Sequence, residues 1–307
     1  MKKLDNNKII KKMLEKLPKE SIKIDEPMKN HTSFKIGGPA DIFIVPKNIE
    51  HIKYAVKVCR ENEIPFYILG NGSNLLVRDK GFRGVIIQIY KNMNNVKIEG
   101  EEVWAEAGIL LSSLSKKIVE AKLTGFEFAS GIPGTFGGAI YMNAGAYEGE
   151  IKQVLVSADV IDEYGNQMTL SNEELELGYR NSILQKKGYI ALSGRLKLKK
   201  GDVNKIKEKI KYLTDKRVSK QPLDMPSAGS TFKRPKGYYA GKLIMDSGLR
   251  GYSIGGAKVS EKHCGFVVNT GNATAKDVIN LIKHIQNTVK EKFGVFMEPE
   301  IRIIGEE

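Results

Sequence analysis

The feature that most limits how this 307-residue chain can fold is a glycine-rich segment near its middle, SGIPGTFGGAIYMNAGAYEGE at residues 130–150. Five glycines stand among small residues there: Gly131, Gly134, Gly137, Gly138 and Gly145. This is more glycine than an ordinary turn requires. Because glycine has no side chain, it allows another group to approach the backbone closely. The segment therefore predicts that something lies against the main chain at this point.

A second glycine loop, GNGSN at residues 70–74, directly follows an apolar run that ends at Leu69. Backbone amides that are freed at the end of a strand can point at an anion. The dinucleotide fingerprint of Rossmann domains is absent, because Asn74 and Leu75 stand where a further glycine is required. A P-loop is excluded as well, because Gly241-Lys242 is followed by Leu243 and no glycine sits five positions before Gly241. Taken alone, each glycine loop is as consistent with a structural turn as with a phosphate cradle.

The flanking sequence predicts a mixture of strands and helices. Short β-branched and aromatic runs at 41–46, 65–70 and 84–90 are typical of strands, and Asn48 caps a helix between the first two, so this part predicts a βαβ unit. An amphipathic helix precedes it at the N-terminus. Strand pairs are expected at 96–108 and 154–170, the latter with a turn near Gly165, and a further strand at 189–198, with a helix near 112–123. After a charged boundary near residue 200, we expect a helix at 203–217, a strand at 264–269, a helix from Thr274 closed by Gly294, and a final strand at 300–304.

Composition and charge exclude several classes of protein. No run approaches the roughly 20 apolar residues of a membrane helix, so we expect a soluble cytoplasmic protein. The net charge of +13 comes from scattered lysines. It suits an anionic small substrate, and no basic stripe interleaved with aromatics indicates nucleic acid. Cys59 and Cys264 lie far apart, and His263-Cys264 lacks a second pair of ligands, so neither a disulfide nor a metal site is expected.

Seven strings, in order, resemble the motifs of the UDP-N-acetylenolpyruvoylglucosamine reductases of peptidoglycan precursor synthesis. They cover nearly the whole chain after residue 30: NHTSFKIGGPAD (30–41), GNGSNLLV (70–77), GIPGTFGGAIYMNAGAYEGE (131–150), GYRNS (178–182), PSAGSTFKRP (226–235), GGAKVSEKHCGFVVN (255–269) and EPEIR (298–302). Any one of these strings is weakly specific, whereas seven in the family's order are hard to obtain by accident.

The resemblance implies an α+β protein that binds FAD and is reduced by NADPH. It implies an N-terminal helix and lead-in at 1–30, a non-Rossmann FAD-binding domain of the vanillyl-alcohol oxidase and p-cresol methylhydroxylase type at 31–199, split near residue 90, and an α+β substrate-binding domain at 200–307. The two glycine loops would hold the FAD pyrophosphate, and Asn143 would lie near the flavin. The residues implied in the loops are Gly70, Asn71, Gly72, Ser73, Asn74, Gly131, Pro133, Gly134, Thr135, Gly137, Gly138 and Ala139.

The resemblance also implies three catalytic residues for reducing UDP-N-acetylglucosamine enolpyruvate to UDP-N-acetylmuramate. Hydride addition to the enolpyruvyl group leaves a carbanion beside a carboxylate, so fixed donors are needed at the carboxylate oxygens. Arg180 suits this task, and Glu300 would do so in its protonated form, because an ionised carboxylate would repel the anion. Ser230 would protonate the carbanion. Three further residues are equally consistent with contact to a diphosphate of the substrate or of NADPH and with solvated surface charge: Lys233, Arg234 and Arg250.

One departure from the family pattern places the chain in its shorter class. One class carries an inserted loop after GYRNS with a tyrosine that closes over the substrate, and here residues 184–202 run directly into the next domain without it. Two other functions are consistent with part of the pattern. Another FAD enzyme of the same cofactor fold, acting on alcohols or hydroxy acids, would keep the glycine loops without the Arg/Ser/Glu set. A protein that binds acidic nucleotides or nucleic acid without catalysis would be colourless.

Overall fold

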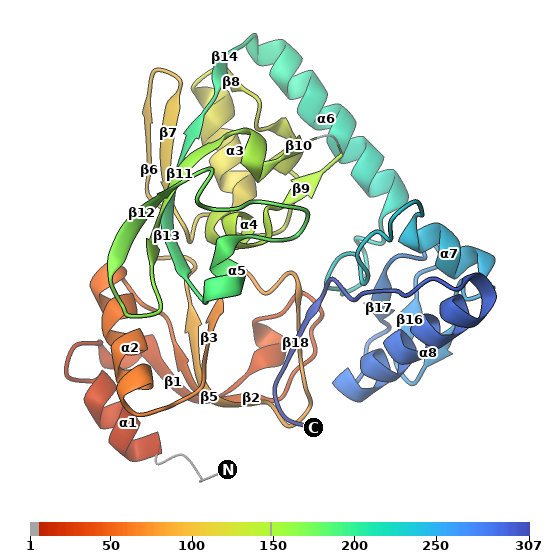
Figure 1. Ribbon diagram of the computed structural model, residues 1–307, viewed down its shortest axis with the longest axis horizontal. Helices are drawn as coiled ribbons and strands as arrows, with labels where there is room; N and C mark the ends of the chain where they lie inside the picture. Colours follow the sequence, from red (N-terminus) through yellow and green to blue (C-terminus); the bar gives the residue numbers. More distant parts are fainter. Residues whose placement is uncertain (1–5, 148) are drawn as a thin grey trace. The chain divides into compact units, whose positions relative to one another are not determined.

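A computed structural model describes residues 6–147 and 149–307, which form two compact units (Figure 1). Of the described residues, unit 1 comprises 6–23, 42–71, 84–147 and 149–217, and unit 2 comprises 24–41, 72–83 and 218–307. The chain passes between the units within three strands, β1 (Ile22–Pro27), β2 (Pro39–Ile44) and β5 (Phe82–Gln88), and also between residues 71 and 72 and between residues 217 and 218. The first five residues of the expected N-terminal helix lie outside the described residues, and the helix α1 spans Asn6–Met13.

The N-terminal part of unit 1 is built on a sheet with the strand order β1-β2-β5-β3. Helix α2 (Ile49–Glu61) follows β2 and leads to β3 (Phe66–Leu69), which pairs in parallel with β5. The side chain of Asn48 accepts a hydrogen bond from the backbone N–H of His51 at 2.9 Å, so the predicted helix cap is confirmed. The buried face of α2 carries Ile52, Ala55, Val56, Val58 and Cys59. Strand β5 lies between β2 and β3, so the two strands of the predicted βαβ unit are not neighbours in the sheet.

The second sheet of unit 1 has five antiparallel strands in the order β12-β11-β13-β7-β6. Their bounds are β6 Val96–Glu99, β7 Glu102–Glu106, β11 Leu155–Ile161, β12 Gln167–Ser171 and β13 Ile190–Lys197. The turn between β11 and β12 is closed by Asp162, whose Oδ1 accepts from the backbone N–H groups of Tyr164 and Asn166 at 2.8 Å each. Gly165 adopts a φ of 92° there, which confirms the predicted turn.

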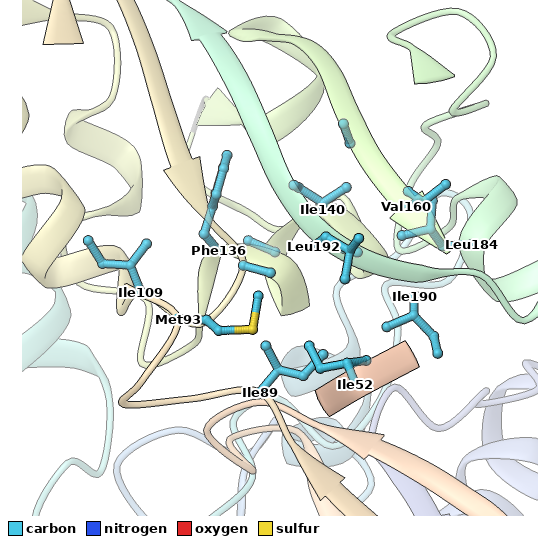
Figure 2. Close-up of a cluster of buried hydrophobic side chains, with 14 of the residues drawn as sticks. Ile52, Ile89, Met93, Ile109, Phe136, Ile140, Val160, Leu184, Ile190 and Leu192 are labelled. Carbon is cyan, nitrogen blue, oxygen red and sulfur yellow. The ribbon is translucent and has the colours of Figure 1, made fainter. Parts of the chain in front are cut away.

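Part of the glycine-rich segment is a helix, α4 (Phe136–Met142), where the sequence analysis expected a loop. The cause is packing against strand β13. A Cβ built at Gly194 of β13 would lie 2.9 Å from both Ile140 Cδ1 and Phe136 Cε1. Figure 2 shows Phe136 and Ile140 in the cluster of buried side chains that also holds Leu192 of β13. The helix is therefore secured by apolar contacts with a strand some 50 residues further along the chain.

Unit 2 has its own apolar core around the last long helix, α8 (Ala275–Phe293). The helix starts with a capping box between Thr274 and Asp277 and ends at Gly294 with a φ of 67°, as the sequence predicted. A remote residue adds to this cap: the carboxylate of Asp79 accepts from the backbone N–H groups of Ala275 at 2.8 Å and Lys276 at 3.0 Å. A three-stranded sheet of unit 2 consists of β15 (Ser253–Ile254), β16 (Ala257–Val259) and β17 (Val267–Asn269).

Helix α6 (Val203–Lys220) extends past the last residue of unit 1, residue 217, and unit 2 resumes at residue 218. Leu213 of this helix is buried, and its carbonyl accepts a hydrogen bond from the Tyr147 hydroxyl at 3.1 Å. No helix among the described residues is long and apolar enough to cross a membrane. The remaining helices are α3 (Leu111–Glu120), α5 (Ile183–Lys187) and α7 (Ala240–Asp246), and the remaining strands are β4 (Leu75–Val77), β8 (Leu123–Thr124), β9 (Gly145–Ala146), β10 (Gly149–Glu150), β14 (Lys199–Lys200) and β18 (Arg302–Ile304).

Candidate cofactor and active site

The first two residues of the GNGSN loop, Gly70 and Asn71, contact the second glycine-rich segment within unit 1. The Asn71 side chain donates to the carbonyl oxygen of Pro133 at 2.9 Å, and a Cβ built at Gly70 would lie 2.5 Å from Thr135 Oγ1. Gln88 of β5 supports the first loop by donating to the carbonyl oxygen of Gly70 at 3.2 Å. Segments some 60 residues apart in sequence therefore form one continuous backbone surface.

Several glycines are required by the protein's own packing. Gly72 has a φ of 65°, and a Cβ there would lie 2.0 Å from the carbonyl oxygen of His31. At Gly137 a Cβ would lie 2.7 Å from the Cβ of Ala107. The group that approaches the backbone at these positions, and at Gly70, is thus another part of the chain. The close approach that the sequence predicted is present, with protein atoms as the partner.

The loops also present main-chain donors that suit an anion. Within the part of unit 1 that the structure describes, the backbone N–H groups of Asn71, Gly134 and Thr135 make no hydrogen bond. Backbone N–H groups at glycine-rich turns are a common way of binding phosphate oxygens. These donors fit a pyrophosphate such as that of FAD without any lysine or arginine side chain.

Asn143 is fully buried at the C-terminus of α4, in the left-handed conformation with a φ of 42°. Its Nδ2 donates to the carbonyl oxygen of Gly178 at 3.0 Å, and its Oδ1 accepts from the backbone N–H of Lys152 at 2.9 Å. Both ends of the carboxamide are thus engaged with the backbone of unit 1. This arrangement gives Asn143 a structural task that the sequence analysis did not foresee.

Arg180 lies in unit 1, in a two-residue turn between Gly178 and Asn181. Its φ of 53° is uncommon for a residue with a side chain. Its guanidinium donates to the carbonyl oxygen of Gly145 at 3.3 Å and lies 5.0 Å from the ring centroid of Tyr179. The expected carboxylate-binding arginine is therefore held on a strained turn.

Ser230 and Glu300 belong to unit 2, on neighbouring segments. The backbone N–H of Glu300 donates to the carbonyl oxygen of Thr231 at 2.8 Å. Asn74, at the end of the first glycine loop, donates through Nδ2 to the carbonyl oxygen of Glu300 at 3.2 Å. Ser230 is exposed, and Glu300 is half-buried. The structure thus gathers two of the three predicted catalytic residues and one predicted cofactor-loop residue in unit 2, whereas Arg180 is part of unit 1.

Each of the three basic residues expected to meet a diphosphate has a partner in unit 2. Lys233 forms an ion pair with Glu298 at 2.6 Å. The guanidinium of Arg234 stacks over the Tyr239 ring at 4.0 Å, and Arg250 donates to the carbonyl oxygen of Glu261 at 2.5 Å. A phosphate would have to compete with these contacts or extend them.

Arg217 in α6 is a candidate that the sequence reasoning missed. A Cβ built at Gly131 would lie 3.2 Å from Arg217 Cδ, so this side chain covers the start of the second glycine loop. Burial lowers the pKa of its guanidinium. The signal in the sequence was weak, because Arg217 stands among many charged residues on an otherwise exposed helix.

Comparison with known proteins identifies the family. Residues 221–304 match the family model described as UDP-N-acetylenolpyruvoylglucosamine reductase, C-terminal domain, and residues 40–171 match an FAD binding domain. The UDP-N-acetylenolpyruvoylglucosamine reductase of Alkaliphilus oremlandii is 57% identical over 304 residues, which are 99% of this chain and 100% of that protein.

Solved structures agree. The crystal structure of the Thermus caldophilus UDP-N-acetylenolpyruvylglucosamine reductase matches with a TM-score of 0.79 and 35% identity, covering 92% of this chain and 98% of that one. p-Cresol methylhydroxylase matches with a TM-score of 0.50 and 19% identity, over 64% of this chain and 43% of that one, which supports the predicted cofactor fold alone. The chain belongs to the UDP-N-acetylenolpyruvoylglucosamine reductase family.

Proposed function

We propose that this protein uses NADPH and FAD to reduce UDP-N-acetylglucosamine enolpyruvate to UDP-N-acetylmuramate during peptidoglycan precursor synthesis. Family membership over 99% of the chain supports the reaction, and the match of residues 40–171 to an FAD binding domain supports the cofactor. The structural observation that carries the proposal is the backbone pairing of Glu300 with Thr231, which brings Ser230 and Glu300 onto adjacent segments. The residues of the two glycine loops would hold FAD, which would supply the hydride chemistry that carries reducing equivalents from NADPH to the substrate.

Arg180 and Glu300 act on the substrate carboxylate. Hydride arrives at the methylene carbon of the enolpyruvyl ether, and negative charge develops at the adjacent carbon and spreads into the carboxylate. Arg180 stabilises this charge through paired hydrogen bonds from its permanently charged guanidinium. Glu300 donates a hydrogen bond from its protonated carboxyl, since an ionised group would repel the developing anion.

Ser230 supplies the proton that completes the reaction at the carbon next to the carboxylate. A serine hydroxyl is a weak acid, but the carbanion is a much stronger base, so transfer is favourable without an activating histidine. The neighbour of Ser230 is firmly held: Thr231 is buried, its N–H donates to Gly265 at 2.8 Å, and its hydroxyl accepts from Val267 at 3.0 Å. This anchoring limits the positions that the Ser230 hydroxyl can take.

The basic residues of unit 2 bind the diphosphate of the substrate or of NADPH in this proposal. Lys233 exchanges its ion pair with the exposed Glu298 for a phosphate oxygen, and Arg234 and Arg250 add charge beside it. The protein acts in the cytoplasm, where its nucleotide substrates are made.

The test is NADPH oxidation by the purified yellow holoenzyme, measured with and without the enolpyruvyl nucleotide sugar. We expect a substrate-dependent rate, and its absence would refute the proposed reaction. The variant Ser230→Ala separates the two half-reactions, flavin reduction by NADPH and flavin reoxidation by the substrate. Reduction of bound flavin by NADPH should proceed at the wild-type rate, whereas reoxidation by the enolpyruvyl substrate should slow by at least about 100-fold, within the range attributed to general acid catalysis. Equal slowing of both halves would remove Ser230 as the proton donor.

A further inference from the structure

The turn that carries Arg180 cannot hold its shape by local preference. Gly178 and Asn181 exchange both backbone hydrogen bonds at 3.1 Å, and Arg180 between them has a φ of 53°. A non-glycine residue in this region costs of order 1 kcal/mol or more, and it persists only where its surroundings enforce it. The elements packed against the turn therefore determine where the guanidinium stands.

Asn143 is the first of these supports. Its fully buried carboxamide donates to the carbonyl oxygen of Gly178 at 3.0 Å, at the residue where the turn begins. The other end of the same carboxamide accepts from the backbone N–H of Lys152 at 2.9 Å, which fixes its orientation. An unmet buried donor or acceptor costs about 1–3 kcal/mol, so this bridge is a strong constraint.

Gln185 is the second support, on the other side of the turn. Its Nε2 donates to the carbonyl oxygen of Arg180 at 3.2 Å and to that of Tyr141 at 2.7 Å. The Ser182 hydroxyl donates to the same Tyr141 carbonyl at 2.7 Å. The last turn of α4 thus holds the Arg180 turn at both ends, through Asn143 and through the Tyr141 carbonyl.

We propose that Asn143 is a positioning residue for Arg180, with Gln185 as the second support, and that it is not a contact residue for the flavin. The inference rests on the proposed function for its kinetic consequence. Loss of the Asn143–Gly178 hydrogen bond releases the strained turn, and the guanidinium then meets the substrate carboxylate less often in the productive geometry. The step that uses Arg180 slows, whereas cofactor binding and flavin reduction do not.

The kinetic test compares Asn143→Gly and Asn143→Asp with the wild-type holoenzyme. Glycine and aspartate both tolerate the left-handed backbone at this position, so the test changes the side chain alone. Bound FAD and its absorbance spectrum should match the wild type, and flavin reduction by NADPH should stay within about two-fold. We expect reoxidation by the enolpyruvyl substrate to fall about 10- to 100-fold, the cost usual for a small displacement of a catalytic group.

Asn172→Ala is the matched control. Asn172 donates to the carbonyl oxygens of Lys152 and Leu155, so it ties the same neighbouring segment without touching the turn. This variant should lower stability and leave both half-reactions near the wild-type rate. If it slows reoxidation as much as Asn143→Gly does, the slower rate results from a general loss of stability in this segment and not from the Arg180 turn, and the proposal fails.

Asn143→Asp provides a second readout that depends on pH. An ionised carboxylate cannot donate to the Gly178 carbonyl, but a protonated carboxyl can. The ratio of the variant's reoxidation rate to that of the wild type should therefore rise as the pH is lowered. A ratio independent of pH, an altered flavin spectrum, or equal slowing of both half-reactions would overturn the positioning role.

Limited trypsin digestion tests the turn without using the reaction. Release of the turn should make the Arg180–Asn181 bond of Asn143→Gly several-fold more susceptible to cleavage than in Asn172→Ala. Equal cleavage would contradict the proposal whether or not the enzyme reduces the enolpyruvyl sugar. A wild-type enzyme without substrate-dependent activity would instead refute the proposed function and leave this structural result to stand by itself.

Discussion

Gly70→Ala should disturb the junction of the two glycine loops through a single atom. A Cβ at this position would lie 2.5 Å from Thr135 Oγ1, whereas the next atoms, Thr135 Cγ2 and Cβ, would be 3.5 and 3.6 Å away. The backbone of Gly70 lies outside the left-handed region, so alanine is not strained there. The whole cost therefore comes from displacing the Thr135 hydroxyl.

The magnitude follows from what that hydroxyl does. Overpacking of this kind costs about 1–3 kcal/mol. The same hydroxyl caps α4 by accepting from the N–H of Gly138 at 3.3 Å, and loss of such a cap costs about 1 kcal/mol. We expect Gly70→Ala to destabilise the protein by about 2–3 kcal/mol and Thr135→Ala by about 1 kcal/mol. In the double variant the clashing atom is gone, so it should resemble Thr135→Ala alone.

Urea unfolding of the holoenzyme at a fixed excess of FAD measures the stability of the wild type, the two single variants and the double variant. Flavin fluorescence measures their affinity for FAD. The dissociation constant for FAD should rise about ten-fold or more in Gly70→Ala, since about 1.4 kcal/mol corresponds to a factor of ten. The double variant should return to the affinity of Thr135→Ala. Additive effects of the two substitutions, in either measurement, would refute the reasoning, because a double variant that resembles Thr135→Ala alone implies a coupling of about 2–3 kcal/mol in stability between them.

Three further predictions concern other parts of the chain. Asp79→Ala removes two hydrogen bonds to the start of α8 and should lower the free energy of unfolding by about 1–2 kcal/mol, with Asp79→Asn losing roughly half as much; an unchanged urea midpoint in both would contradict the capping role. Glu300→Gln should keep part of the substrate reoxidation rate because a neutral donor remains, and complete loss would indicate that ionisation of Glu300 matters. Burial raises the pKa of the Cys59 thiol from 9.0 to about 12, so a thiolate-directed reagent at pH 8 should modify Cys59 only after unfolding. Because the folded state holds this proton more tightly, the contribution of the Cys59 thiol to stability is complete below pH 9 and is lost as the pH rises toward 12. If the stability of Cys59→Ala falls over this pH range as much as that of the wild type, other groups cause the change.

Helices whose ends are determined by neighbouring residues could be predicted from the sequence. Helix α2 begins at Asn48 because that side chain caps its own first turn, and α8 runs from Thr274 to Gly294 because both signals lie at its ends. The order of the seven motifs also sufficed to predict the family, the cofactor and the reaction, which the comparisons support.

The helical state of residues 136–142 could not be predicted in the same way. Their glycines favour a loop, and the helix is stabilised by Phe136 and Ile140 packing against Gly194 in β13. The Asp79 cap on α8 also lies far away in sequence, because it spans 196 residues. Such contacts depend on the path of the whole chain, which composition and periodicity do not describe.

The two glycine-rich stretches, 70–74 and 130–150, by themselves determined that another group lies against the backbone and, together with the other motifs, which family the chain joins. Only the tertiary structure decided what that group is at Gly70, Gly72 and Gly137, where it is the protein's own atoms. It also decided that Asn143 serves the Arg180 turn, through a hydrogen bond to a residue 35 positions away. The physical reason is range: glycine, caps and periodicity act on neighbouring residues, whereas the partner of a buried polar group is chosen when distant segments pack together.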